Sequence, residues 1–277
     1  MRVDLRGKVI AITGASSGIG RATAIACARA GMSVVVHARR EDRLIEVVKQ
    51  IESEGGRAAW CSGDVARTED NRRLVDFAVS RFGSLYSVFA NAGYGLERPV
   101  LGYTDEELLA IFQTNFQGTL DLMRLAGRML LERPRVDDQP RGHVLVCSSC
   151  VSKIGLPQYA AYSASKALQD HFARAMRIEL ADQGVAVSSV HPIGTRTEFF
   201  DVAKDLSGGK RVSIQTPERF KQPAETVADA VVRCLRRPRG EVWTSTPMRA
   251  LLALGTLFPG FADYLLLRRH RSVSRGA

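Results

Sequence analysis

The feature that most constrains the fold of this chain is a strict alternation of short apolar runs with amphipathic or alanine-rich segments. The apolar runs have the length and β-branched content of buried strands, and a glycine follows several of the segments between them, as at helix ends. We expect strands at 8–13, 32–38, 57–64, 84–93, 143–149, 185–192 and 241–246. Helices are expected at 21–31, 40–56, 68–83 with Thr68 as its N-terminal cap, 105–131, around Tyr162 and near 223–236. This order predicts an α/β fold, a Rossmann-like doubly wound sheet of seven parallel strands with helices on both faces.

Length and composition indicate one large domain followed by an extension. The 277 residues are 45% hydrophobic and 25% charged, as is usual for a globular protein. The stretch 134–142, with two prolines and mixed charge, is typical of an exposed loop. We therefore expect a single domain over residues 1–247 and an apolar, basic extension over 248–277.

The five cysteines favour a reducing compartment and indicate no metal site, since they show neither a ligand spacing nor a dense disulfide framework. They are Cys27, Cys61, Cys147, Cys150 and Cys234. The CSSC sequence at 147–150 closes an apolar run expected to be a strand, where residues three apart are separated by about 10 Å, too far for a disulfide. The first strand has polar flanks in place of a secretory signal, so we expect a cytoplasmic protein.

The net charge of +10 leaves several anionic partners open. Arginine dominates the C-terminal part of the chain, where only Glu241 and Asp263 oppose it after residue 232. Such a balance suits nucleic acid, anionic lipid or an acidic substrate, or simply forms a well-solvated surface. Aromatic residues do not interleave with these arginines as in nucleic-acid binders, so we expect no nucleic-acid partner.

A glycine-rich turn, TGASSGIG at 13–20, joins the first expected strand to the first helix. Gly14, Gly18 and Gly20 are spaced G-x-x-x-G-x-G, which differs from the common G-x-G-x-x-G dinucleotide fingerprint. The physical requirement is the same, because glycine permits a tight turn and lets a pyrophosphate approach the N-terminus of a helix. This turn predicts a dinucleotide cofactor.

The end of the second strand indicates which dinucleotide is bound. A carboxylate at this place would accept hydrogen bonds from the ribose hydroxyls of NAD(H). The sequence here is HARRE, with Arg39 and Arg40 after Ala38, and two guanidinium groups suit a 2′-phosphate. We therefore favour NADP(H) over NAD(H); the alternative is that one or both arginines point to solvent.

Tyr162 and Lys166 lie four residues apart in AAYSASKALQDH at 160–171, a helix-forming stretch. This spacing places both side chains on one helical face. By itself, the pair favours a tyrosine packed on the core beside a solvated lysine.

Taken together and in order, these motifs resemble the short-chain dehydrogenase/reductase family over residues 5–247. The resemblance is carried by TGASSGIG, Asp64–Val65, the NAG of 91–93, Asn115 in TNFQGTL, Ser149 and the Tyr162-Ser-Ala-Ser-Lys166 run. It implies an enzyme that transfers a hydride between a nicotinamide and a carbonyl/alcohol pair.

The resemblance also implies a catalytic group of four residues. Tyr162 would be the acid in reduction and the base in oxidation, and the Lys166 ammonium would lower the pKa of its phenol and hold the nicotinamide ribose. Ser149 would hydrogen-bond the substrate oxygen, and Asn115 would hold a water that relays protons to Lys166.

Cofactor contacts follow from the same resemblance and from the two arginines. They are expected from Gly14, Ser16, Ser17, Gly18, Ile19, Gly20, Arg39, Arg40, Asp64, Val65, Asn91, Ala92, Gly93, Tyr162, Lys166, Pro192, Ile193, Thr195 and Thr197. In HPIGTRTEFF, Ile193 replaces the usual glycine of the family, and this departure puts the contacts of Ile193 and Thr195 in doubt.

Two further segments are expected to choose the substrate. The loop at 197–222 contains Phe199, Phe200, Lys204, Lys210, Arg211 and a Gly208-Gly209 hinge, a composition that suits either a mobile lid over an apolar substrate with an anionic end or an ordinary loop. The tail at 248–277 is interrupted by Pro259, Gly260 and Asp263, so we expect two short helices around 258–260 rather than a spanning helix. They would lie on a membrane through residues 248–271, with RRHR on anionic headgroups, or pack against the substrate cleft or a sister subunit.

The function expected from the sequence is an NADP(H)-dependent oxidoreductase that interconverts a carbonyl and a secondary alcohol on a lipophilic small molecule. One alternative is a 3-oxoacyl thioester reductase, since the acidic carrier proteins of such substrates would suit a basic surface. Another is a non-catalytic NADP-binding sensor or scaffold. Family resemblance also implies a homodimer or homotetramer, assembled through the helices around 105–131 and 155–180.

Overall fold

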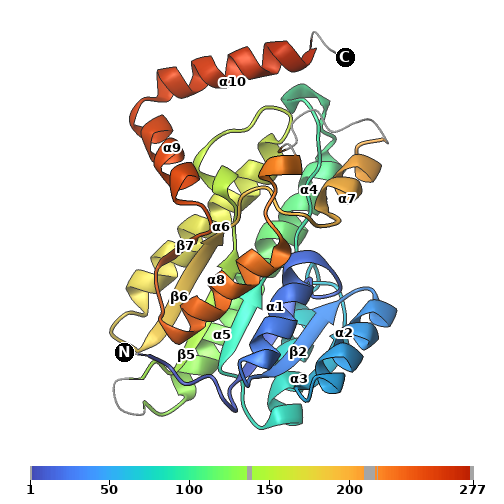
Figure 1. Cartoon of the computed structure of the whole chain (residues 1–277), viewed down its shortest axis with the longest axis vertical. Coiled ribbons are helices and arrows are strands. Elements are labelled where there is room, and N and C mark those ends of the chain that lie inside the picture. Colours follow the sequence, from blue (N-terminus) through green and yellow to red (C-terminus); the bar gives the residue numbers. More distant parts are fainter. Residues whose placement is uncertain (1, 136–138, 209–215, 217, 275–277) are drawn as a thin grey trace.

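The computed structural model describes residues 2–135, 139–208, 216 and 218–274, and its centre is one open sheet (Figure 1). The seven strands are β1 (Val9–Thr13), β2 (Ser33–Ala38), β3 (Arg57–Ser62), β4 (Ser87–Ala90), β5 (Gly142–Cys147), β6 (Val185–His191) and β7 (Glu241–Trp243). They pair in parallel in the order β3-β2-β1-β4-β5-β6-β7. The expected doubly wound, seven-stranded parallel sheet is confirmed.

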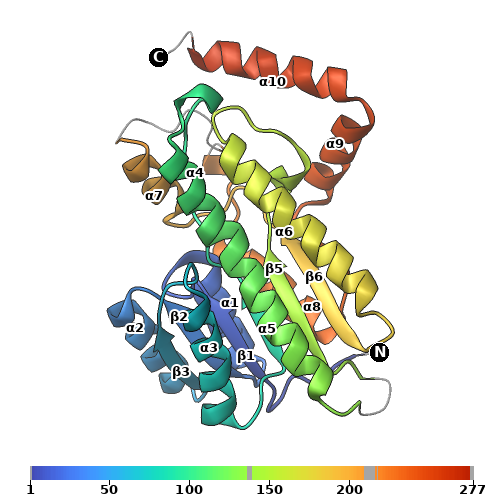
Figure 2. The same ribbon diagram turned by 180° about the vertical axis from the view of Figure 1, so that it is seen from behind.

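Helices cover both faces of this sheet. Those of the domain are α1 (Gly18–Arg29), α2 (Glu41–Ser53), α3 (Thr68–Phe82), α4 (Asp105–Phe112), α5 (Gly118–Glu132), α6 (Ala160–Glu179), α7 (Phe199–Leu206) and α8 (Ala224–Arg236), with short turns of helix η1 (Val100–Gly102), η3 (Cys150–Lys153) and η4 (Glu218–Phe220). α1, α2 and α8 lie on the face seen in Figure 1, while α3, α5 and α6 lie on the opposite face, seen in Figure 2.

Alternating side chains of the strands explain the two layers. In β1, Ile10 and Ile12 belong to the core under α1, α2 and α8, whereas Val9 and Ala11 belong to the core under α3, α5 and α6. Successive side chains of a strand point to opposite faces, so a strand buried on both faces must be apolar at every position. All five β1 residues are buried and four are apolar; the fifth, Thr13, is satisfied because its hydroxyl accepts from the backbone N–H groups of Asn91 and Ala92.

The order of the strands reverses beside β1, and this reversal places the ligand site. β1 pairs with β2 on one side and with β4 on the other. The loops that follow β1 and β4 therefore leave in opposite directions and open a crevice at the carboxyl ends of the strands, where open α/β sheets bind their ligands.

Two local expectations are corrected by the structure. The helix expected over 105–131 contains a π-helical turn, η2 (Gln113–Gln117), between α4 and α5. Thr68 does not cap α3 but is its first helical residue, because its hydroxyl donates to the Asp121 carboxylate of α5 at 2.6 Å. Tertiary contacts therefore decide both details.

The tail forms two helices, as expected, α9 (Thr246–Leu257) and α10 (Pro259–Ser274). α9 contacts η3, whereas α10 projects from the body of the molecule (Figure 1). Over the described part of the chain, no single helix has the length and apolar character to cross a membrane. The two segments Thr246–Leu257 and Pro259–Arg268 are long and apolar enough only when taken together, and a bend of 114° separates them.

Candidate active site

A single cavity of about 1160 Å³ connects the carboxyl ends of the strands with α7, α9 and α10. This volume exceeds the ordinary upper range for one drug-sized ligand, about 1,000 Å³, and provides room for a dinucleotide and a substrate together. All the residues expected to contact the cofactor line it, except Gly20.

The glycine-rich turn forms the polar end of the cavity. Gly14 has φ of +63°, and a Cβ there would lie 2.9 Å from the Ala92 Cα. Gly20 does not line the cavity; instead a Cβ at this position would lie 2.3 Å from the Gly14 carbonyl oxygen, so glycine lets α1 pack directly on the turn. The first N–H groups of α1 have no partners within the helix and can receive a pyrophosphate.

Asn91 holds this turn against the neighbouring strand. Its side-chain amide donates to the carbonyl oxygens of Thr13 and Gly14 at 3.0 and 3.3 Å, and its backbone N–H donates to Thr13 Oγ1. The amide therefore fixes the two carboxyl strand ends across the crevice. Asp64 and Val65, from the loop after β3, line the same end of the cavity.

The two arginines expected to select the cofactor behave differently. Arg40 Nη2 donates to the hydroxyls of Ser16 and Ser17 at 3.1 and 3.0 Å and pairs with the Glu198 carboxylate at 2.8 Å. Arg39 is mostly exposed and approaches Asp64 only at 3.9 Å. Both line the cavity, so their guanidinium groups can face an anionic ligand at the end of β2.

The loop after β6 also lines the cavity, despite its unusual Ile193. Thr195 Oγ1 donates to the Ile193 carbonyl at 2.7 Å, and Ile193 N–H donates to Thr244 Oγ1. A Cβ on Gly194 would lie 2.3 Å from Thr216 Oγ1, so the close approach of Thr216 favours glycine at this position. Thr197 and Pro192 complete this wall.

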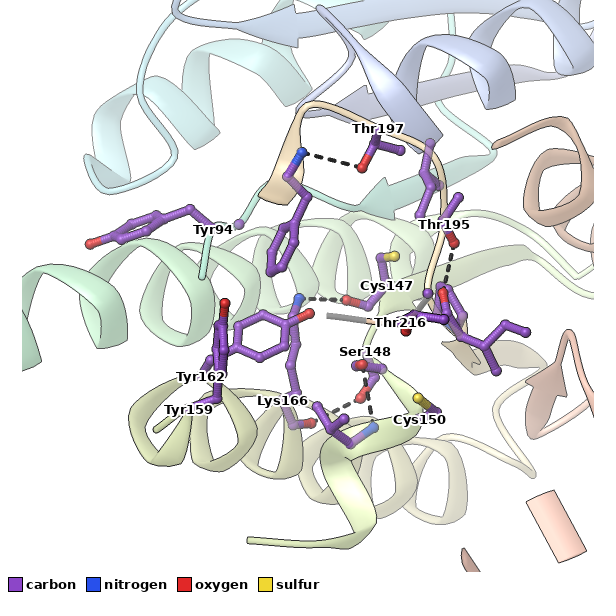
Figure 3. Close-up of a pocket in the computed structure, with 18 of the residues that line it drawn as sticks. Tyr94, Cys147, Ser148, Cys150, Tyr159, Tyr162, Lys166, Thr195, Thr197 and Thr216 are labelled. Atoms are coloured by element: carbon purple, nitrogen blue, oxygen red, sulfur yellow. Dashed lines mark hydrogen bonds between the residues drawn. The ribbon is translucent and has the colours of Figure 1, made fainter. Parts of the chain in front are cut away.

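Tyr162 and Lys166 point from α6 into one space beside β5 (Figure 3). The Lys166 ammonium nitrogen lies 5.7 Å from the centre of the Tyr162 ring. Burial raises the pKa of Tyr162 above its ordinary value, and a hydrogen bond with Ser149 offsets only part of that rise. The core-tyrosine alternative is thereby disfavoured, because both side chains reach the cavity.

The expected lowering of the Tyr162 pKa by Lys166 is not what the structure shows. Lys166 Nζ donates to the Cys147 carbonyl oxygen at 2.8 Å and to Gln169 Oε1 at 3.1 Å. Burial lowers the pKa of Lys166 itself. Two of the three N–H groups of the ammonium are thus taken by buried acceptors, and the effect of burial on the pKa of the phenol prevails.

Asn115 lies in the π-helical turn and is completely buried. Its side chain accepts from Tyr94 N–H and donates to the Tyr94 carbonyl and to Ser165 Oγ. Its own carbonyl oxygen accepts from Gln169 Nε2 and from Thr119 Oγ1. The structure therefore brings Asn115 next to Lys166 through Gln169, while Asn115 itself does not line the cavity.

The opposite end of the cavity is apolar. The Phe199 ring, at the start of α7, lies 5.1 Å from that of Tyr162. The apolar residues that line this end are Val151, Ile154, Leu156, Pro157, Phe199, Phe200, Val202, Phe220, Met248, Leu251, Leu252, Leu254, Phe261, Leu265 and Leu266. They come from η3, the loop before α6, α7, η4, α9 and α10. Gly209, Lys210 and Arg211, expected in the lid, lie outside the described residues.

A charged cluster lies behind Ser149. Among the described residues, Asp170, His191 and Glu241 form the one group close enough to hold a metal ion, but the Lys153 ammonium already contacts both carboxylates. His191 Nδ1 lies 3.1 Å from the Ser149 carbonyl oxygen. Lys153 and Arg249 thus compensate the two carboxylates, and the cluster supports the segment that carries Ser149.

Sequence reasoning missed two residues of this site. Gln169 lies three residues after Lys166, so helical spacing alone could have indicated it. Glu198 had no local signal, since its partner Arg40 is 158 positions away in the sequence.

Together, the reversal of strand order and the glycine-lined crevice define a dinucleotide-binding α/β enzyme. Comparison with known proteins supports this class. The chain matches the family model of short chain dehydrogenases over residues 8–206. It is 32% identical over 205 residues to an uncharacterized oxidoreductase of Listeria innocua, Lin0452, covering 73% of this chain and 80% of that protein. It is 28% identical over 267 residues to an uncharacterized oxidoreductase of Bacillus subtilis, YxnA, covering 95% of this chain and 72% of that protein.

Solved structures show the same fold. A short-chain dehydrogenase/reductase from Burkholderia phymatum in complex with NAD superimposes with a TM-score of 0.81 at 23% identity, covering 91% of this chain and 94% of that one. An alcohol dehydrogenase from the archaeon Thermococcus sibiricus complexed with 5-hydroxy-NADP gives 0.73 at 27% identity, with 85% and 95% covered. This chain belongs to the short-chain dehydrogenase/reductase family and is an NAD(P)-dependent oxidoreductase.

Proposed function

We propose that the protein is an NADP(H)-dependent reductase of a lipophilic ketone or aldehyde, and that Tyr162, Ser149, Lys166 and Asn115 form its catalytic group. The observation that carries this proposal is the position of Tyr162, between the glycine-rich turn and the apolar end of one cavity. A hydride donor on the turn side and a carbonyl on the apolar side would meet at this phenol.

The residues of the site divide the chemistry among them. The cofactor, held by the glycine-rich turn, supplies the hydride. Ser149 Oγ donates a hydrogen bond to the carbonyl oxygen, and the Tyr162 hydroxyl donates the proton that this oxygen needs as negative charge develops on it. Lys166 holds its ammonium close to the phenol and stabilises the phenolate left after proton transfer.

The raised pKa of Tyr162 favours one direction of the reaction. Below that pKa the phenol is protonated, which is the form that reduction consumes; oxidation requires the phenolate. We therefore propose that reduction is the favoured direction near neutral pH.

Arg40 supports NADP(H) as the cofactor. Its guanidinium is held by Ser16 and Ser17 at the edge of the turn, so it is already oriented when a 2′-phosphate arrives. The Thermococcus relative was solved with an NADP derivative. Arg39, being exposed, would add a second charge beside the first.

The apolar end of the cavity supports a lipophilic substrate. Aromatic and aliphatic side chains form its walls, and the large volume would accommodate a ring system or a long chain beside the nicotinamide. A relative, the versicolorin reductase of Emericella nidulans, is 35% identical over 197 residues, covering 71% of this chain and 72% of that protein. Its name gives versicolorin as the compound that it reduces.

The decisive experiment follows NADPH absorbance with apolar ketones, quinones, aldehydes and 3-oxoacyl thioesters, with the Tyr162→Phe variant in parallel. Turnover of ketones by the wild type only would support the proposal. Faster turnover of the thioesters would favour the 3-oxoacyl thioester alternative. Tight NADPH binding with no turnover of any substrate would instead indicate a sensor or scaffold.

We further propose that α9 and α10 rest on an anionic membrane surface. Eight large apolar side chains of this pair are 41–71% exposed. They are Leu251, Leu254, Leu257, Phe258, Phe261, Tyr264, Leu265 and Leu267. The exposed Arg268 and Arg271 follow them directly and would face phosphate headgroups. Four of the eight also line the cavity, so a lipophilic substrate could enter from the lipid.

Cosedimentation with vesicles tests this contact. The full chain should bind vesicles that contain phosphatidylglycerol, bind pure phosphatidylcholine more weakly, and dissociate at high salt. Size-exclusion chromatography of the wild type and the Leu257→Ser variant provides the contrast. If the wild type does not bind vesicles and is a dimer, whereas Leu257→Ser is a monomer, the apolar face would be assigned to a second copy of the chain.

A further inference from the structure

Gln169 forms a buried bridge between the lysine and the asparagine of the site. Its side chain is 1% exposed and stands one turn along α6 from Lys166. Gln169 Oε1 accepts from Lys166 Nζ at 3.1 Å, and Gln169 Nε2 donates to the Asn115 carbonyl oxygen and to Thr119 Oγ1, the latter at 2.9 Å. All three partners are themselves buried.

The partners determine which way the amide is turned. Lys166 can only donate, so it requires the oxygen of Gln169 on its side. The Asn115 carbonyl can only accept, so it requires the nitrogen. The reverse orientation would place two donors together and two acceptors together, each without a partner in a buried place, at a cost of about 1–3 kcal/mol per group.

We infer that Gln169 is a positioning residue for catalysis: its amide bridges Lys166 to the Asn115 carbonyl, where the family resemblance places a water. This inference rests on the proposed function. Unlike a water, the Gln169 amide is tethered to α6 and cannot leave or reorient freely. The lysine therefore keeps one position throughout the reaction.

With this bridge in place, one N–H group of the Lys166 ammonium remains for the cavity. Of its three N–H groups, one donates to the Cys147 carbonyl and one to Gln169. The third remains for the cavity, which Lys166 lines and where the resemblance puts the cofactor ribose and the phenol. Gln169 thereby aims the charge as well as holding it.

The same amide ties the lysine to the π-helical turn. The Asn115 carbonyl accepts from both Gln169 and Thr119, one turn further along. A π-helical turn inside a helix is uncommon and is often found at functional sites. In a regular α-helix the Asn115 carbonyl would accept the backbone N–H four residues later. The π-helical turn instead directs this carbonyl toward α6.

Removal of the bridge should alter the acidity of Tyr162. The titratable groups that face Tyr162 and Lys166 are Cys147 of β5, Cys150 of η3 and Tyr159 before α6, and none of these is a carboxylate. Gln169 is therefore an important acceptor for the buried ammonium. If Lys166 loses it, its charged form is disfavoured and the Tyr162 phenolate becomes harder to form.

Two substitutions of opposite sign test the inference in the NADP⁺-dependent oxidation of an alcohol. In Gln169→Leu the pH profile of kcat should move to higher pH by about one unit, and kcat near neutral pH should fall about tenfold. In Gln169→Glu a carboxylate faces the ammonium, so the profile should move to lower pH. Gln183→Leu, which changes an exposed glutamine after α6, is the matched control and should leave the profile unchanged.

Gln169→Ala distinguishes bridging from simple packing. The smaller side chain leaves a polar space lined by Lys166, Asn115 and Thr119, in which a water can restore the bridge. We expect Gln169→Ala to retain more activity than Gln169→Leu, although it removes more packing. A packing role would give the reverse order, and it would overturn the inference, as would profiles that stay in place in both the leucine and the glutamate variants.

Failure of the inference is distinguishable from failure of the proposed function. Wild-type turnover that is lost in Tyr162→Phe establishes the reaction independently of Gln169. If the wild type turns over no alcohol or carbonyl, both proposals fall together. If Gln169→Leu does not fold, the shift of the Gln169→Glu profile to lower pH, measured against wild type and Gln169→Ala, still decides the question.

Discussion

The two ends of the cavity are built by different means. The turn end consists of backbone and small side chains from β1, β4 and the start of α1, held by hydrogen bonds such as those of Asn91. The substrate end consists of large apolar side chains from α7, α9 and α10, several of which remain exposed. A ligand common to many enzymes can be held by backbone geometry, whereas selection of a particular substrate depends on shape and apolar area.

The largest effect is expected at the boundary between the two ends. Tyr162→Phe removes the proton donor and should lower kcat by about 10²–10⁴-fold, the usual contribution of a positioned acid or base. The dissociation constant of NADPH, measured by fluorescence titration, should stay within about twofold because the ring is retained. A variant with normal kcat would remove Tyr162 from the mechanism.

The pH dependence should separate the two directions of the reaction. Because the pKa of Tyr162 is raised, the phenolate is the minor form at neutral pH and grows about tenfold per unit as pH rises toward that pKa. Initial rates of alcohol oxidation should therefore climb over the alkaline range, while carbonyl reduction stays flat until the phenol itself ionises. An oxidation rate that levels off near neutral pH would contradict a raised pKa.

The turn end can be tested with a matched pair of glycines. Gly14→Ala introduces a Cβ at positive φ and 2.9 Å from the Ala92 backbone, so NADPH affinity should fall at least tenfold. Gly55→Ala also falls at positive φ, +79°, but in open space. It should lower the free energy of unfolding by about 1 kcal/mol and leave the NADPH affinity unchanged. Equal loss of affinity in both variants would mean that strain alone, and not the cavity, is responsible.

Substitution of the two partners of the Arg40–Glu198 ion pair should change the cofactor preference in opposite directions. Arg40→Ala should lower the preference for NADPH over NADH about tenfold, since a charge-assisted hydrogen bond to the 2′-phosphate is lost. Glu198→Gln should increase that preference a few-fold, because Arg40 no longer pairs with a carboxylate. The ratio of kcat/KM for the two cofactors measures both, and a preference that Arg40→Ala leaves intact would contradict the assignment of Arg40.

The smallest effect is expected at the substrate end. Phe261→Ser on α10 reduces the apolar wall and should raise KM for an apolar ketone about fivefold, while the NADPH dissociation constant is unchanged. Ala250→Ser on α9, exposed and outside the cavity, is the control. If Phe261→Ser instead weakens NADPH binding, the division of the cavity into two ends is wrong.

Several features of the molecule were accessible from its sequence, for local physical reasons. Apolar runs such as residues 8–13 have few alternatives to a buried strand, and a glycine-rich turn between a strand and a helix requires little more than its neighbours to adopt its shape. The four-residue spacing of Tyr162 and Lys166 likewise placed both on one helical face. These features depend on interactions within a few residues.

Other features depended on contacts between distant segments. Thr68 lost its capping role to Asp121, which lies 53 positions later. Helical propensity in the stretch around Asn115 did not indicate a π-helical turn, which is accompanied by hydrogen bonds from Gln169 and Thr119 to the Asn115 carbonyl. The pKa of Tyr162 is raised rather than lowered because burial, a property of the whole fold, outweighs the hydrogen bond with Ser149.

By itself, then, the sequence determined the order of strands and helices, the phosphate-binding turn and the face of α6 that carries Tyr162 and Lys166, because periodicity and glycine act locally. Only the tertiary structure decided that Arg40 meets Glu198, that Gln169 joins Lys166 to Asn115, and that α9 and α10 close an apolar cavity rather than lie against the sheet. Each of these features brings together residues that are far apart in the sequence, or depends on a balance between burial and charge. Such contacts and balances exist only once the chain has packed.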